Sequence, residues 1–199
     1  MLEIISNHMR IKMKKKLLLH SCCGPCSTVI IKDLSNEYDI TVYYYNPNIE
    51  PNEEYELRKE EQIKFLQKFN KEIKIITPTY NNQDYQDAII DYEDLGEKTK
   101  RCYECYKLRI DKTAKYALEN HYDYFDTTLS ISPHKNSSWI KELGFLAEDK
   151  YKVKYLAGDY KKQDGYKRSI ELAKEYDLYR QEYCGCLASA KYLNLDSKI

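Results

Sequence analysis

Seven cysteines are the residues of this chain best able to do chemistry, and they occur in three groups. The groups are Cys22, Cys23 and Cys26, then Cys102 and Cys105, and finally Cys184 and Cys186. A [4Fe-4S] cluster or an all-cysteine zinc site takes four thiolates, so seven thiols cannot fill two such sites. We therefore predict one four-thiolate site and a second thiol device, which is either another metal ion or a dithiol pair.

Three kinds of chemistry are compatible with these groups. Cys23-Gly24-Pro25-Cys26 has the spacing of a thioredoxin-like thiol-disulfide oxidoreductase, but that hypothesis gives the other thiol groups no role. A structural zinc-binding module needs four thiolates in tetrahedral geometry, and the adjacent Cys22 and Cys23 are awkward for one small ion. An iron-sulfur redox enzyme uses more of the thiols. In it, Cys184 and Cys186 would hold a second metal or close to a strained, easily reduced disulfide bond.

The segments around the thiols predict an α/β fold with a parallel sheet flanked by helices and a helical C-terminal part. Strands are expected over residues 16–21, 40–45, 74–78 and 124–129, and helices over 27–34, 53–69, 103–120, 137–148, 166–176 and 187–193. The first thiol group would follow a buried strand and lie near a helix N-terminus, whose dipole favours thiolates. The second would straddle the first turn of the helix 103–120, and the third would precede the last helix.

Length and charge limit the organisation of the chain. It has 199 residues, with 32 Lys+Arg against 32 Asp+Glu, which predicts one domain over 16–199 after an N-terminal extension over 1–15. No apolar run approaches the ~18 residues of a membrane-spanning helix, and residues 1–10 lack the pattern of a secretion signal, so we expect a cytoplasmic protein. Because the net charge is zero, any contact with nucleic acid must be local.

Longer runs of sequence carry a more specific signal. They include HSCCGPCS at 20–27, YNPNI at 45–49, RCYECY at 101–106, TTL at 127–129, DYKK at 159–162 and YRQEYCGC at 179–186. In type, order and spacing they resemble epoxyqueuosine reductase of the cobalamin-independent QueH type, over about residues 17–191. The chain departs from that family at 95–100 (LGEKTK), where paired glycines are usual, and its N-terminal extension is not part of the pattern.

The resemblance implies the reduction of epoxyqueuosine to queuosine at the wobble position of tRNA, the last step of queuosine biosynthesis. It also implies a [4Fe-4S] cluster, an additional mononuclear iron and an external electron donor. Carried onto this chain, the implied cluster ligands are Cys22, Cys23, Cys102 and Cys105. Cys184 and Cys186 are then the redox-active pair or ligands of the second iron, and Cys26 is an extra metal ligand. Candidate proton donors for the epoxide oxygen are His20, Tyr106 and His134.

An anticodon loop is recognised by stacking on aromatic rings together with cationic contacts to phosphate groups. Basic residues within the motifs are the candidates for these tRNA contacts: Arg109, Lys135, Lys161, Lys162 and Arg168. The implied fold resembles the adenine-nucleotide alpha hydrolase (HUP-like) superfamily. Cys22 and Cys23 stand where that superfamily has the glycines of its phosphate loop, so no ATP site is expected.

Overall fold

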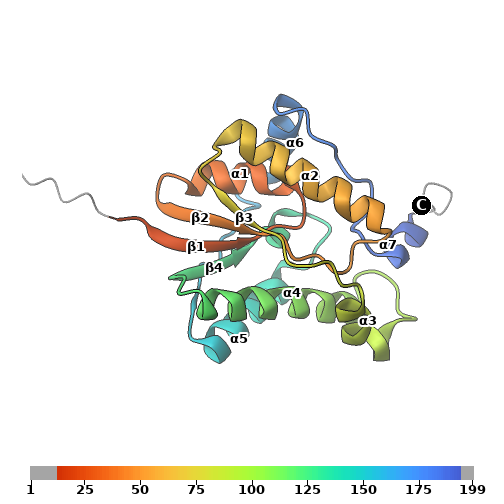
Figure 1. The fold of residues 1–199 in the computed structure, drawn as a ribbon. Helices are drawn as coiled ribbons and strands as arrows, with labels where there is room; N and C mark the ends of the chain where they lie inside the picture. Colours follow the sequence, from red (N-terminus) through yellow and green to blue (C-terminus); the bar gives the residue numbers. More distant parts are fainter. Residues whose placement is uncertain (1–12, 194–199) are drawn as a thin grey trace, which may run out of the picture.

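A five-stranded parallel sheet forms the centre of the molecule (Figure 1). The computed structural model describes residues 13–193. The strands follow the spatial order β3-β2-β1-β4-β5. Their bounds are β1 (Lys15–His20), β2 (Tyr38–Tyr43), β3 (Lys74–Ile76), β4 (Tyr124–Thr127) and β5 (Lys154–Tyr155). The first strand therefore lies in the middle, and the chain beyond its carboxyl end enters the crevice where such sheets carry their chemistry.

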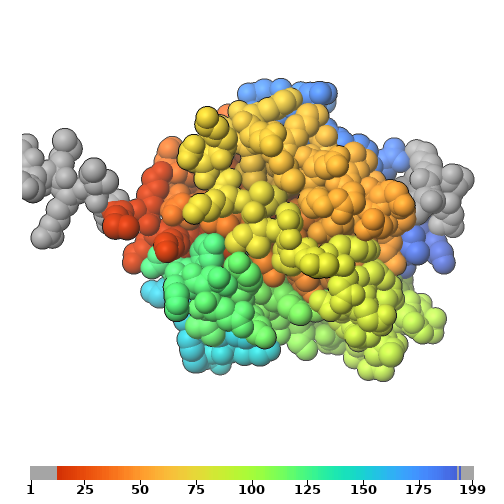
Figure 2. All heavy atoms as spheres, viewed as in Figure 1, coloured from red at the N-terminus to blue at the C-terminus, as the bar shows by residue number. Residues whose placement is uncertain are grey.

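Helices cover both faces of the sheet. They are α1 (Gly24–Leu34), α2 (Asn52–Phe69), α3 (Gln83–Ile89), α4 (Lys100–Glu119), α5 (Ser137–Tyr151), α6 (Gly165–Glu175) and α7 (Leu187–Tyr192), with short 3-10 helices η1 (Ile90–Tyr92) and η2 (Thr128–Ile131). Helices α1, α2 and α6 lie on one face, and α4 and α5 lie on the other (Figure 1). In Figure 2, α2 (orange) and the segment from β3 to α3 (yellow) form much of the visible surface.

The central strand explains why the sheet is buried on both sides. Leu17, Leu18 and Leu19 are fully buried, with Leu18 in the core under α4 and α5 and the other two in the core under α1, α2 and α6. A strand covered by helices on both faces has a continuous apolar sequence, as β1 does. The predicted α/β fold with a flanked parallel sheet is confirmed.

The structure differs from the expected elements in several places; helix α4, for example, begins at Lys100 rather than at residue 103. Helix α1 begins at Gly24 rather than at residue 27, so Cys26 lies in its first turn. Strand β4 ends at Thr127, and the chain continues as η2. Helix α3 and strand β5 were not expected, because one has seven residues and the other two, too few to show a periodicity. Of the predicted extension 1–15, residues 1–12 lie outside the described residues.

The segment 95–100, where the chain departs from its resemblance, contains a residue in the left-handed conformation. Lys98 has a φ of 60°, which glycine adopts without strain and other residues adopt at a cost. The lysine therefore takes up the backbone geometry that a glycine would fill more easily. Within residues 13–193, every helix is too short or too polar to cross a membrane.

Candidate metal centre

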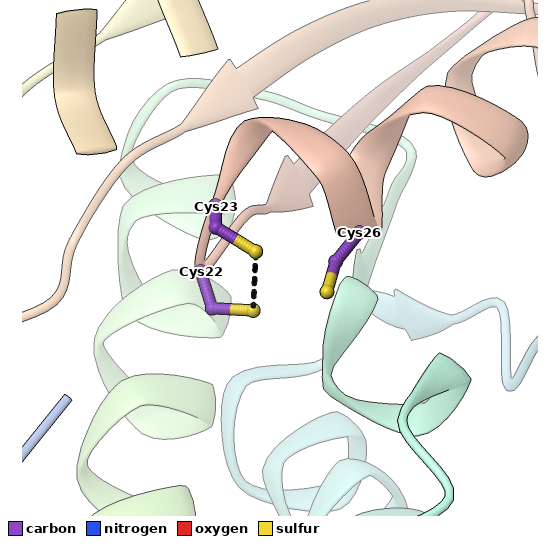
Figure 3. Close-up of side chains that lie close together, drawn as sticks. All are labelled: Cys22, Cys23 and Cys26. Atoms are coloured by element: carbon purple, nitrogen blue, oxygen red, sulfur yellow. Dashed lines mark hydrogen bonds between the residues drawn. The ribbon is translucent and has the colours of Figure 1, made fainter. Parts of the chain in front are cut away.

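The first thiol group forms a compact set at the carboxyl end of β1. Cys22 and Cys23 lie between β1 and α1, and Cys26 points toward them from the first turn of α1 (Figure 3). The Sγ atoms of the three lie within 4.8 Å of one another, and those of Cys22 and Cys23 are 3.9 Å apart. Three sulfur ligands at this spacing are compatible with binding one metal ion.

Hydrogen bonds within this set favour the thiolate form at Cys22 over the other two positions. Hydrogen bonds with the thiols of Cys23 and Cys26 hold the pKa of Cys22 well below its usual range. The same contacts raise the pKa of Cys23 to about 12 and raise that of Cys26 as well. A metal ion bound here must therefore displace protons from the other two thiols, which makes metal binding pH-dependent.

The second and third groups meet in one pocket next to the first group. Cys102, Cys105, Cys184 and Cys186 all line this small pocket between the start of α4 and the segment before α7, which we call the thiol pocket. An adjoining cavity of about 300 Å³, the open pocket, is lined by Cys26, Cys102 and Cys184. Gln181 also donates through Nε2 to the sulfur of Cys23 at 2.9 Å. The three groups therefore lie close together at one end of the sheet.

Contacts from α2 and the segment before it position the third group. Arg58, which is 2% exposed, donates to the carbonyl oxygens of Tyr183 and Cys184, each at 3.2 Å. The backbone nitrogen of Glu50 donates to the carbonyl oxygen of Gly185 at 2.8 Å. Gly185 has a φ of +134°, and a Cβ there would lie 3.0 Å from the side chain of Ile49. Glycine is thus required between the two cysteines.

All seven cysteines are free thiols, so the disulfide bond that was one of the two alternatives for Cys184 and Cys186 is not formed in this structure. The donor set is compatible with an iron-sulfur group, because soft thiolate ligands favour such clusters. A second observation agrees with this. Arg101 lines the thiol pocket, is buried, and has two guanidinium nitrogens, Nε and Nη2, without a hydrogen-bond partner among the described residues. A buried cation beside four thiols suits an anionic occupant.

The three predicted proton donors lie in different surroundings. His20 is fully buried; its Nε2 lies 3.1 Å from the Tyr45 carbonyl oxygen, to which it donates, and its Nδ1 accepts from the Thr127 hydroxyl at 2.8 Å. Burial, and then the charge of Arg109, lower the pKa of His20 to about 4, so the ring is neutral at pH 7. Because the ring is fully buried, it is not open to a substrate. Tyr106 lines both pockets, and burial raises its pKa. His134 is exposed at the open pocket.

The five basic residues predicted to contact tRNA are dispersed. Arg109 is 1% exposed and donates through Nη2 to the sulfur of Cys105 at 3.3 Å, so it faces the thiols and is not available to a phosphate group. Lys135 lines the open pocket. Lys161 is half-buried and donates to the Ser137 hydroxyl at 2.5 Å. The two remaining residues make ion pairs at the surface, Lys162 with Asp159 and Arg168 with Asp33.

Two further cations at the open pocket were not among the predicted tRNA contacts. Lys98 and Arg180 line it together with Tyr166 and Tyr183. Both cations lie within four residues of a cysteine, so closeness in sequence to the thiol groups was the signal that would have identified them.

Comparison with known proteins identifies the family. The family model described as "Epoxyqueuosine reductase QueH" matches residues 17–192. A relative of that name from Streptococcus pyogenes serotype M1 is 40% identical over 92% of this chain and 74% of its own length. The Staphylococcus aureus relative of that name is 39% identical over 98% and 84%, and the Thermotoga maritima one is 35% identical over 87% and 89%. The α/β sheet and the converging thiols thus belong to a member of the QueH family of epoxyqueuosine reductases, which are oxidoreductases.

Proposed function

We propose that this chain reduces epoxyqueuosine to queuosine at the wobble position of tRNA. The observation that supports this most directly is the convergence of thiols from three distant segments beside an open pocket. The overall reaction consumes two electrons and two protons and releases the epoxide oxygen as water. An external electron donor must supply the electrons, because seven free thiols alone would be consumed by repeated turnover.

A [4Fe-4S] cluster and an additional mononuclear iron are the cofactors that we propose for these thiols. Cys22, Cys23, Cys102 and Cys105 would hold the cluster. Cys26 would be an extra metal ligand, and Cys184 with Cys186 would bind the second iron or act as a redox pair. When bound, such cofactors supply electrons and an open Lewis-acid position.

The protein's own residues would place the epoxide and deliver protons to its oxygen. The Tyr106 hydroxyl is our first candidate proton donor, because the ring lines both pockets and burial keeps it protonated at neutral pH. Burial by itself lowers the pKa of Lys135. The sulfur atoms of Cys184, Cys22 and Cys26 raise it by more than burial lowers it, so the net effect is a raised pKa. The Lys135 ammonium group would therefore stay charged at the open pocket. His134 is a candidate at the exposed edge.

The open pocket would admit the modified nucleoside. Its volume of about 300 Å³ lies at the lower end of the range for small-molecule sites. Tyr166 and Tyr183 offer rings for stacking, and Lys98 and Arg180 offer cations for phosphate groups. These local groups, together with the exposed Lys162, would compensate for the zero net charge of the chain. We therefore place the anticodon loop over the mouth of this pocket.

The test is mass spectrometry of tRNA nucleosides after anaerobic incubation of reconstituted protein with epoxyqueuosine-containing tRNA and a reductant. Conversion to queuosine is expected, and Cys102→Ser should abolish both conversion and retention of iron and sulfide. Lys115→Ser is the matched control, because it alters an exposed position on the same helix, α4, and should leave both unchanged.

Metal analysis provides the opposing outcomes. Zinc without acid-labile sulfide would favour a structural zinc-binding module. Metal-free protein that reduces disulfides would favour a thioredoxin-like oxidoreductase. Full activity of Cys102→Ser would remove that residue from the mechanism.

A further inference from the structure

Arg101 is a buried cation without the partners that such a group requires. It is 3% exposed, and both Nε and Nη2 are enclosed without a hydrogen-bond partner among the described residues. Burying a charged group in this way is unfavourable unless a counter-charge or hydrogen-bond acceptors compensate. The side chain lines the thiol pocket, next to its sequence neighbour Cys102. The missing partner of Arg101 therefore belongs in that pocket.

No carboxylate of residues 13–193 forms an ion pair with Arg101. Burial raises the pKa of the Glu50 carboxylate and the charge of Arg101 acts to lower it, but the two groups make no hydrogen bond. Glu97 lines the same pocket but makes no ion pair with Arg101 within 4.0 Å. Arg58 provides the comparison, because it is equally buried but has Glu54 at 2.6 Å and two backbone carbonyl oxygens as acceptors. Arg58 thus has a full set of hydrogen-bond acceptors, whereas Arg101 has free N–H groups and lines a pocket with four thiols.

Arg109 adds a second buried cation on the same side. It also lacks a carboxylate partner among the described residues, and its Nη2 and Nε donate to the sulfur and the carbonyl oxygen of Cys105. Both arginines come from α4, one just before Cys102 and the other one helical turn after Cys105. The thiol pocket is therefore built with positive charge on the helix that supplies two of its thiols, and an anionic occupant would balance it.

We propose that Arg101 is the charge partner of the iron-sulfur cluster, two of whose proposed ligands, Cys102 and Cys105, line the same pocket. Its free Nε–H and Nη2–H groups would donate to the cluster's sulfur atoms. This rests on the proposed function only for the identity of the cofactor. A cluster ligated by thiolates is an anion, and it becomes more negative when reduced by one electron. A nearby cation with N–H donors favours the reduced form, so Arg101 raises the reduction potential of the cluster. Arg101 is a positioning and tuning residue rather than a catalytic one.

The first experiment measures the reduction potential. Wild-type protein, Arg101→Met and Arg101→Lys are reconstituted anaerobically with iron and sulfide and titrated with dithionite under electron paramagnetic resonance. Arg101→Met should have the lowest potential, and a tenfold loss of preference for the reduced form corresponds to about 59 mV for one electron. Arg101→Lys should fall in between, because it keeps the charge but not the planar fork. An unchanged potential in Arg101→Met at equal iron and sulfide content would overturn the proposal.

The second experiment uses the metal-free protein, so it remains decisive if Arg101→Met does not take up a cluster. Removing an uncompensated buried cation should leave the melting temperature of the metal-free protein unchanged or higher. The increase on cofactor loading should shrink. Arg58→Met is the matched control and should melt lower with or without cofactor, because its partners are already in place. Arg101 would be an ordinary structural residue if Arg101→Met lowered both melting temperatures in the same way.

These readouts separate the proposal from the assignment of the reaction. A protein that loads a cluster and shows the potential shift, but does not convert epoxyqueuosine, would refute the proposed function and retain the charge partner. A protein that binds zinc without sulfide would refute the cluster and with it the role of Arg101 as cluster partner.

Discussion

Replacing Arg58 with methionine should loosen the segment that carries Cys184 and Cys186. The guanidinium of Arg58 holds the carbonyl oxygens of Tyr183 and Cys184 and pairs with Glu54. Methionine fills a similar volume but donates no hydrogen bond. The substitution leaves two carbonyl oxygens and one carboxylate without their principal donor.

The expected loss of stability is about 3 kcal/mol. Removing one partner of a buried ion pair costs about 3–5 kcal/mol, because the other charge stays buried without compensation. The side chain of Glu54 is only 12% exposed, so little water can replace the arginine. The Tyr179 hydroxyl still donates to the Glu54 carboxylate, at 3.2 and 3.3 Å, which places the loss at the lower end of the range. For a chain of this size the melting temperature should fall by about 6–12 °C.

Two measurements on metal-free protein check this. Urea denaturation followed by circular dichroism gives the free energy of unfolding, and the alkylation rate of Cys184 under native conditions reports how firmly the segment is held. The second substitution Glu54→Leu, added to Arg58→Met, should recover about 1–2 kcal/mol because it removes the unpaired carboxylate. A loss below about 0.5 kcal/mol with an unchanged alkylation rate would show that Arg58 does not hold the thiol segment.

Three further predictions concern positions away from Arg58 and its partners. Lys98→Gly should raise the free energy of unfolding by about 0.5–1 kcal/mol. Glycine removes the strain of the left-handed φ of 60°, and the greater entropy of the unfolded chain offsets part of that gain. A lower melting temperature would contradict this. Burial raises the pKa of Asp126 to about 6 from its usual 3.8. Between these two pH values the folded protein keeps a proton on Asp126 that the unfolded chain has released, so the free energy of unfolding falls as the pH rises through this range. Denaturant titrations should therefore show the wild type losing about 2 kcal/mol relative to Asp126→Asn between pH 4 and 7, whereas a constant difference would disprove the assignment. Gly144→Ala should cost about 1–3 kcal/mol, because the new Cβ would lie 2.1 Å from the Tyr155 ring, and iron uptake should persist since the site is remote.

The sheet could be predicted from the sequence because its strands are short apolar runs separated by helical patterns. The burial of Leu17, Leu18 and Leu19 follows directly from that pattern. The position of the third thiol group could not be predicted in this way. Cys184 lies outside any helix or strand, and the contact that holds it comes from Arg58, 126 residues earlier in the chain. Such a long-range contact leaves no periodic trace in the sequence.

The residue spacing along α4 indicates which of its side chains face the thiols. Arg101, Cys105 and Arg109 are spaced four residues apart, so they lie on one face of the helix. That spacing already indicated that Arg109 faces the thiols rather than the solvent. The role of Arg101 needed the structure, because only packing shows that its guanidinium is enclosed without a partner.

The order in which the polypeptide is made has a consequence for the metal centre. The last strand of the sheet ends at Tyr155, yet the cysteines that complete the thiol pocket are Cys184 and Cys186, close to the last residues described. A nascent chain that has emerged as far as β5 can assemble its whole sheet while the pocket still lacks one wall. Insertion of the proposed cofactor would therefore be completed only after the segment that carries Cys184 and Cys186 has left the ribosome.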